Sequence, residues 1–132
     1  MANLPIGPIA KQTGVKVPTI RFYESIGLLP APPRSEGNRR LYDESAVRRL
    51  RFIRHARELG FEVEAIRQLL TLADDPGRPC HEADAIARSH LAAIDGRLAR
   101  LAALRAEVQC MVDQCSSGTI SECRVIESLA DL

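Results

Sequence analysis

Apolar residues recur at helical spacing from the start of the chain. Ile6, Ile9 and Ala10 fall on one face of a short helix, and Gly14 stands where a left-handed residue can end it. Pro18 suits the first turn of a second helix. Small residues at the break let two such helices cross closely, so the pattern predicts a helix-turn-helix unit.

The periodicity is interrupted after this unit. Pro30, Pro32 and Pro33 exclude a helix, and a tight turn at EGN precedes Arg39 and Arg40. We expect a small β-hairpin here, which would form a wing beside the second helix.

Two further amphipathic helices follow, joined at Gly60, with Asp43 as the N-cap of the first. Their apolar stripes are predicted to close the core of the same domain. The stripe residues are Val47, Leu50, Phe52, Ile53 and Leu59 in the first helix and Val63, Ile66, Leu69, Leu70 and Leu72 in the second.

A long helix is predicted beyond the breaker DDPGRP, from His81 to about Gln114, because this stretch contains no proline and only Gly96. Apolar residues are spaced along it as a heptad repeat. The repeat consists of Ala87, Leu91, Ile94, Leu98, Leu101, Val108, Val112 and Cys115. Arg105 interrupts it, and Leu104 can take over through a local shift of the packing face.

The heptad repeat forms an apolar row along one face of the helix. This row needs a partner, since a long exposed apolar surface is unfavourable in water. A second copy of the chain is the simplest partner. A symmetric dimer with two helix-turn-helix units also matches the two half-sites of a palindromic DNA operator.

Composition favours a mainly α protein, because hydrophobic residues make up 45% of the chain and aromatic residues only 4%. The N-terminus lacks the layout of a signal peptide, and no apolar run is long enough to span a membrane. We therefore expect a cytoplasmic protein.

Charge divides the chain into two halves. Residues 1–60 hold 11 Lys and Arg against 5 Asp and Glu, a net charge of +6, and residues 61–132 hold 7 against 12, a net charge of −5. The basic half suits a polyanion such as DNA. The predicted contacts are Lys16, Thr19, Arg21 and Tyr23 from the second helix and Arg34, Arg39, Arg40 and Tyr42 from the wing.

Four cysteines in a reducing cytosol indicate metal binding, redox chemistry or simple packing. Cys80 begins the long helix and Cys115 follows 35 residues later, so at 1.5 Å per residue they lie about 52 Å apart. They cannot meet within one chain. If two helices pair antiparallel, however, Cys80 of one subunit approaches Cys115 and Cys123 of the other.

Thiolates select soft ions such as Hg, Cd, Pb, Zn and Cu(I). Cys110 lies off the apolar row, and we expect it to be an ordinary buried residue. A disulfide between Cys115 and Cys123 is the alternative, and it would make the protein a thiol redox switch. An enzyme is disfavoured, because no Gly-rich phosphate loop, Ser/His/Asp set or paired carboxylates can be identified.

The motifs TIRFYE, GLL and RRLYD resemble the N-terminal domain of the MerR family of transcriptional regulators, and the resemblance continues through the long helix to the terminal cysteines. It implies a winged helix-turn-helix dimer joined by an antiparallel coiled coil. It also implies a regulator that distorts a promoter so that RNA polymerase can engage both of its elements. The implied parts are a DNA-binding domain at residues 1–75, a linker and dimerisation helix at 76–114, and a metal loop with a short helix at 115–132.

Within this family, the metal sensors carry the terminal cysteine pair, here Cys115 and Cys123. A cysteine where Cys80 stands resembles the sensors of divalent ions, which favours Hg, Cd, Pb or Zn over copper. Zinc prefers four ligands, and the loop between the paired cysteines has no histidine, although His81 beside Cys80 could add a ligand. The resemblance therefore implies a regulator of a metal-detoxification promoter.

Overall fold

A computed structural model describes residues 3–37, 39–114 and 118–130. The chain divides into two compact units, Met1–Ile86 and Ala87–Leu132, and each is described by itself. The described residues are mainly helical, as the composition predicted.

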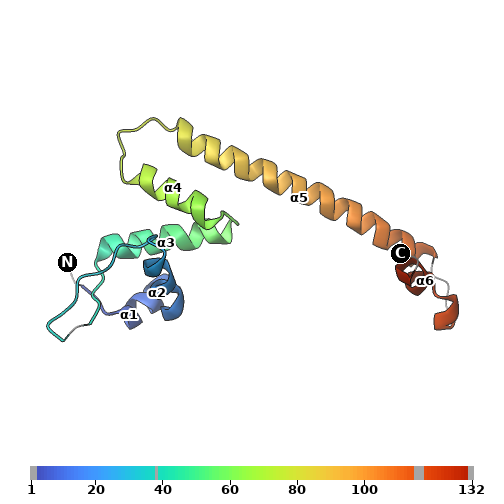
Figure 1. Cartoon of the computed structure of the whole chain (residues 1–132), viewed down its shortest axis with the longest axis horizontal. Helices are drawn as coiled ribbons and strands as arrows, with labels where there is room; N and C mark the ends of the chain where they lie inside the picture. The colour runs from blue at the N-terminus through green and yellow to red at the C-terminus, as the bar shows by residue number, and fades with distance from the viewer. Residues whose placement is uncertain (1–2, 38, 115–117, 131–132) are drawn as a thin grey trace. The chain divides into compact units, whose positions relative to one another are not determined.

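The first unit contains four helices, α1 (Ile6–Thr13), α2 (Val17–Ser25), α3 (Glu44–Glu58) and α4 (Val63–Ala73), and the beginning of α5 (His81–Gln114). Helix α1 packs against both α2 and α3, and α3 packs against α4 (Figure 1). The apolar core lies among these four helices and includes Ile9, Ile20, Leu50, Ile53 and Ile66.

The break between α1 and α2 confirms the predicted helix-turn-helix. Gly14 adopts a left-handed conformation with φ of 73°, and its N–H donates to the Ala10 carbonyl. Pro18 lies in the first turn of α2, where its missing N–H leaves no hydrogen bond unmade. The preferences for glycine in a left-handed turn and for proline in a first helical turn depend only on local backbone conformation, which is why the sequence pattern alone located the break.

Helix α3 begins where predicted, because the Asp43 carboxylate accepts a hydrogen bond of 3.0 Å from the Ala46 N–H. Gly60, with φ of 87°, joins α3 to α4. The predicted stripe on α3 is partly wrong, since Phe52 and Leu59 are 39% and 56% exposed. Leu59 is the C-cap beyond the last turn of α3, and the smaller Ala56 belongs to the core together with Leu50 and Ile53.

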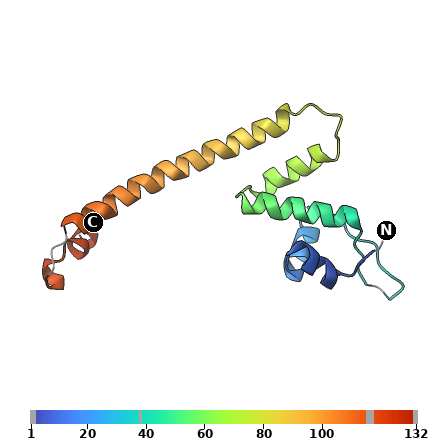
Figure 2. The same cartoon turned by 180° about the vertical axis from the view of Figure 1, so that it is seen from behind.

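The segment after α2 folds back on itself through isolated antiparallel bridges, without strands among the described residues. Arg34 pairs with Arg40, and the Ser35 N–H donates to the Arg39 carbonyl at 2.7 Å. A second bridge joins Leu4 to Tyr42, so the N-terminal residues run beside the end of this segment, which is also visible from behind in Figure 2.

The second unit comprises α5 from Ala87 onward, a 3₁₀ turn at Ile120–Glu122, and α6 (Arg124–Ala130). Helix α5 has the predicted bounds and 34 residues. None of its residues is buried, and the described part of the predicted apolar row is exposed except for the half-buried Ile94, with Leu98 at 60% and Leu101 at 62%. Across the described ranges, none of the helices combines the length and the apolar character that a membrane span requires.

Candidate functional site

The outward face of α2 carries the first candidate surface. Ile20 and Tyr23 point into the core, which leaves Arg21 and Phe22 on the exposed side of this short helix. Lys16 is exposed at the N-cap, as a phosphate contact requires. Two predicted contacts are less accessible: Thr19 is half-buried, and Tyr23 is only 8% exposed.

Phe22 is a surface residue that the sequence analysis missed. Its ring is 52% exposed and lies 6.1 Å from the Tyr23 ring, centroid to centroid. The helical period contained the signal, because Phe22 is out of phase with Ile20 and Tyr23. An exposed aromatic ring beside an arginine can contact a thymine methyl group in the major groove.

The segment that folds back between α2 and α3, residues 33–42, is called the turned-back segment, and it adds arginines to the same unit. Arg34 and Arg39 are exposed, as predicted for phosphate contacts. Arg40 is half-buried, and its Nε lies 3.1 Å from Oε2 of Glu24 on α2. This ion pair joins α2 to the segment that was predicted as a wing.

Tyr42 requires a correction. It was predicted to contact phosphate from the surface, but its side chain is 1% exposed and its hydroxyl donates to Oε1 of Glu24. Burial, and then the hydrogen bond to Glu24 and its negative charge, raise the pKa of Tyr42 far above its ordinary value. The hydroxyl therefore remains a protonated donor, and Tyr42 is a core residue whose polar end is satisfied internally.

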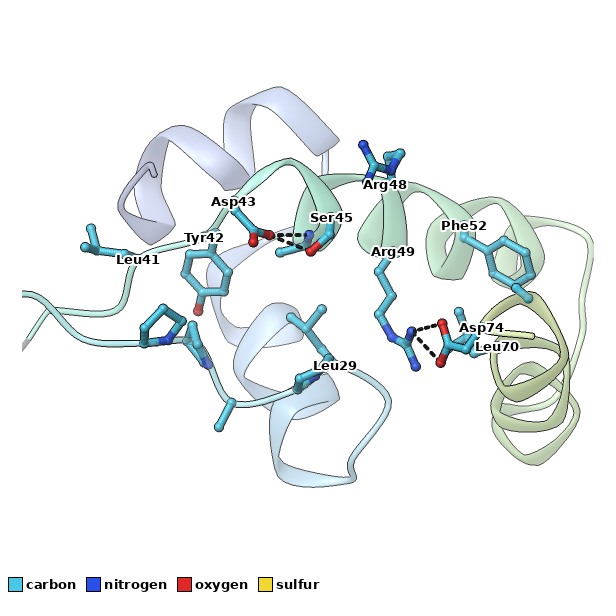
Figure 3. Close-up of a pocket in the computed structure, with 16 residues that line it drawn as sticks. Leu29, Leu41, Tyr42, Asp43, Ser45, Arg48, Arg49, Phe52, Leu70 and Asp74 are labelled. Atoms are coloured by element: carbon cyan, nitrogen blue, oxygen red, sulfur yellow. Dashed lines mark hydrogen bonds and ion pairs between the residues drawn. The ribbon is translucent and has the colours of Figure 1, made fainter. Parts of the chain in front are cut away.

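An open groove of about 540 Å³ lies between the proline-containing residues 29–33, the start of α3 and the end of α4 (Figure 3). Arg49 crosses it, donating to the Leu28 carbonyl at 3.0 Å and to both carboxylate oxygens of Asp74. Asp43, also on its wall, is engaged as the cap of α3. These polar groups are already paired, which favours a structural role for the groove.

The cysteines form the second candidate site. Cys80 is exposed immediately before α5, and its carbonyl accepts from the Asp84 N–H at 3.0 Å. Cys123 is half-buried between the 3₁₀ turn and α6, and its carbonyl accepts from the Glu127 N–H at 3.0 Å. Cys115 lies outside the described residues.

Soft sulfur donors fit a soft metal ion, but a single chain does not assemble a site in the part that the structure describes. No three His, Cys, Asp or Glu side chains there are grouped so that they could hold a metal ion. Cys110 corrects another expectation: it is exposed on α5, and not buried. His81, the possible additional ligand, is exposed at the first residue of α5.

Comparison with known families gives two overlapping matches. A family model described as MerR HTH family regulatory protein matches residues 4–72, and one described as MerR, DNA binding matches residues 47–111. Together they cover the helix-turn-helix unit and most of α5.

Individual relatives match over nearly the whole chain. The HTH-type transcriptional regulator ZntR of Escherichia coli strain K12 is 39% identical over 94% of this chain and 90% of its own length. The mercuric resistance operon regulatory protein of Serratia marcescens is 40% identical over 98% of this chain and 89% of its own. Among solved structures, the transcription regulator PbrR691 from Ralstonia metallidurans CH34, in complex with lead(II), superposes with a TM-score of 0.84. It is 43% identical and covers 96% of this chain and 98% of its own.

Proposed function

Because this chain belongs to the MerR family of helix-turn-helix regulatory proteins, we propose that it is a transcriptional regulator that binds promoter DNA and responds to a soft divalent metal ion. The observation that carries the proposal is the likeness over nearly the full length to a lead-bound regulator, in a chain with cysteines at positions 80, 115 and 123. The protein would act in the cytoplasm, where the promoter and RNA polymerase are found.

Residues 1–75 are the DNA-binding part in this proposal. Arg21 and Phe22 would face base edges in the major groove, while Lys16, Arg34 and Arg39 would hold phosphates beside it. The net charge of +6 in residues 1–60 supports this assignment, because phosphate attraction provides much of the affinity for DNA. The segment around Arg34 and Arg40 serves as the wing.

Residues 76–114 are the dimerisation part. We propose that the exposed apolar row of α5 packs against the same row of a second chain, in antiparallel orientation, as a coiled coil. Burying a row that includes Leu98 and Leu101 removes apolar surface from water on both copies. The two-fold symmetry of such a dimer places two α2 helices to face a palindromic operator.

The antiparallel arrangement also completes the metal site. Cys80 of one subunit would join Cys115 and Cys123 of the partner, the last two from the terminal part 115–132. Three sulfur donors suit Hg, Pb or Cd, and zinc would need a fourth ligand such as His81. A soft ion bound there supplies a cross-link between thiolates of two chains.

Regulation then follows from a difference in stability between two states of the bound dimer. Distorting a promoter costs on the order of a few kcal/mol of DNA elastic energy. The cysteines must therefore hold the dimer in the distorting state with a comparable preference. Because these cysteines come from both subunits, they can change how the two α2 helices are held apart.

A titration with cadmium tests the metal part. The reduced protein should develop thiolate-to-metal charge-transfer absorbance, and Cys80→Ser should lower both affinity and absorbance. Cys110→Ser is the matched control, since Cys110 is an exposed cysteine on α5 but is not a proposed ligand, and it should titrate like wild type. Equal titrations of Cys80→Ser and wild type would refute the three-thiol site. If an oxidant releases DNA and cadmium does not bind, the protein is a redox switch instead.

The DNA part is tested separately with a duplex selected from a random library by the wild-type protein. Arg21→Ala should weaken binding to this duplex by roughly tenfold or more, because an arginine contact to a base edge contributes about 1–3 kcal/mol. Cadmium uptake by the same variant should be unchanged. Unaltered duplex affinity would contradict the assignment of α2 as the recognition helix.

A further inference from the structure

Glu24 is a half-buried acidic residue within residues 1–60, which carry a net charge of +6. Its side chain is 9% exposed, and both carboxylate oxygens are engaged. Oε2 lies 3.1 Å from Nε of Arg40, and Oε1 accepts the hydroxyl hydrogen of Tyr42. The recognition helix α2 thus holds two residues of the turned-back segment through a single carboxylate.

The position of this carboxylate is unfavourable by simple electrostatics. A negative charge on the recognition helix repels a phosphate backbone, and burying a carboxylate costs free energy unless it is paired. Removing the charge should therefore strengthen DNA binding, if charge were the only consideration. The two contacts of Glu24 indicate a reason for its presence.

We propose that Glu24 is a positioning residue for DNA binding, which holds the Arg40 guanidinium at a fixed place beside α2 so that its remaining donors meet a backbone phosphate. The inference rests on the proposed DNA-binding function and extends it to a residue that does not itself touch DNA.

The hydrogen-bond capacity of the groups is consistent with this role. A guanidinium has five N–H donors. Glu24 offers Arg40 only the oxygen that Tyr42 does not take, so donors are left over for a phosphate. Arg40 also retains partial exposure, with 30% of its side chain accessible, so a ligand can reach it.

Tyr42 makes the carboxylate a rigid anchor. Its ring is buried in the core, and its backbone exchanges two hydrogen bonds of 2.8 Å with Leu4. The hydroxyl therefore approaches Glu24 from a fixed direction. An arginine fixed in this way loses less conformational entropy when it binds phosphate than a freely rotating one.

The test compares two substitutions that remove the same charge. Glu24→Gln deletes the carboxylate that holds Arg40, and Glu36→Gln deletes an exposed carboxylate of the turned-back segment. Affinity is measured on the duplex selected by the wild-type protein, over a series of salt concentrations. We expect Glu24→Gln to bind roughly tenfold more weakly, with the slope of log K against log salt reduced by about one, as for the loss of a phosphate contact. Glu36→Gln should bind equally or more tightly.

A double-mutant cycle with Arg40→Ala separates positioning from general damage. If Glu24 acts through Arg40, Glu24→Gln should have little further effect in the Arg40→Ala background. Thermal melts establish that each variant is folded. If Glu24→Gln does not fold at the assay temperature, Tyr42→Phe removes only the hydroxyl and should still weaken binding several-fold.

The inference is overturned if Glu24→Gln binds the duplex more tightly, if its salt slope is unchanged, or if the losses in the double-mutant cycle are additive. Where Tyr42→Phe replaces an unfolded Glu24→Gln, unchanged affinity of Tyr42→Phe overturns it. A wild-type protein that selects no duplex would instead refute the proposed DNA-binding function, so the two failures are distinguishable.

Discussion

Gly14 determines the turn between α1 and α2 at the scale of a single residue. A Cβ placed there would lie 2.3 Å from Nη1 of Arg54, which donates to the Thr13 carbonyl at 2.8 Å. With φ of 73°, Gly14→Ala also strains the backbone by about 1–2 kcal/mol. We expect a loss of about 2 kcal/mol in the free energy of unfolding, measured with urea.

Gly7 is the matched control for this substitution. It lies in α1 without a positive φ, and a Cβ added there would meet nothing within 4 Å, so Gly7→Ala should leave stability unchanged or raise it slightly. Equal effects of the two substitutions would show that the left-handed turn is not the cause.

Asp43, the N-cap of α3, makes the stability of the fold depend on pH. Its hydrogen bond with Ser45, and then that from the Ala46 N–H, lower the pKa of the carboxyl. Because the pKa is lower in the folded state, the ionised Asp43 carboxylate stabilises the fold fully above its unfolded-state pKa of about 3.9. This stabilisation is lost as the pH falls through the folded-state pKa. Asn can also cap a helix but does not titrate. Any advantage of wild type over Asp43→Asn in melting temperature should thus shrink below about pH 4, and a constant difference would contradict this account.

Residues with local backbone signals were predictable, and residues defined by long-range contacts were not. Gly14, Pro18 and Asp43 were located correctly because left-handed turns, first helical turns and N-caps each prefer few residue types. Tyr42 was predicted as a phosphate contact together with the arginines of the expected wing. The Tyr42 ring instead belongs to the core, and its hydroxyl is bound by Glu24, which lies 18 positions away in the sequence.

At the scale of elements, α5 is the feature most dependent on a partner. Leu98→Glu would place a charge in the proposed interface, where it loses hydration without gaining a partner. We expect the dimer dissociation constant to rise by at least about tenfold, measured by sedimentation equilibrium. Ala103→Glu is the control, because Ala103 is exposed on the same helix but outside the apolar row. A dimer equally stable in both variants would exclude the row as the interface.

The predictability of the elements follows the range of the interactions that define them. Helix α5 was predicted with its correct bounds because flanking breakers and an uninterrupted run are both local features. The turned-back segment has an isolated bridge between Arg34 and Arg40 in place of the strands of a hairpin, and a second bridge pairs Tyr42 with Leu4, 38 positions earlier in the sequence. No periodicity in either segment encodes that pairing. The sequence likewise could not distinguish core from surface for Phe52, since both faces of α3 carry apolar residues.

At the scale of the whole molecule, the charge asymmetry and the cysteines argue for the same assembly. The net charge of +6 in residues 1–60 suits the proposed DNA-binding part, whereas the net charge of −5 in residues 61–132 would be repelled by a polyanion. Cys80 and Cys123 are separated by all 34 residues of α5. The proposed sensor therefore needs a second chain, and this requirement can be tested without knowing the physiological ion.

Mixing two defective variants tests whether each metal site is shared between subunits. Cys80→Ser and Cys123→Ser should each lose cadmium binding as homodimers, because every site would lack one thiolate. In a mixed dimer, Cys80 from the second variant can meet the intact terminal cysteines of the first, so one of the two sites is restored. Co-expression with two affinity tags isolates the mixed dimer, and we expect about half of the wild-type stoichiometry in a charge-transfer titration. A site built within one chain would be broken in both subunits, so a mixed dimer that binds no cadmium would exclude the antiparallel arrangement.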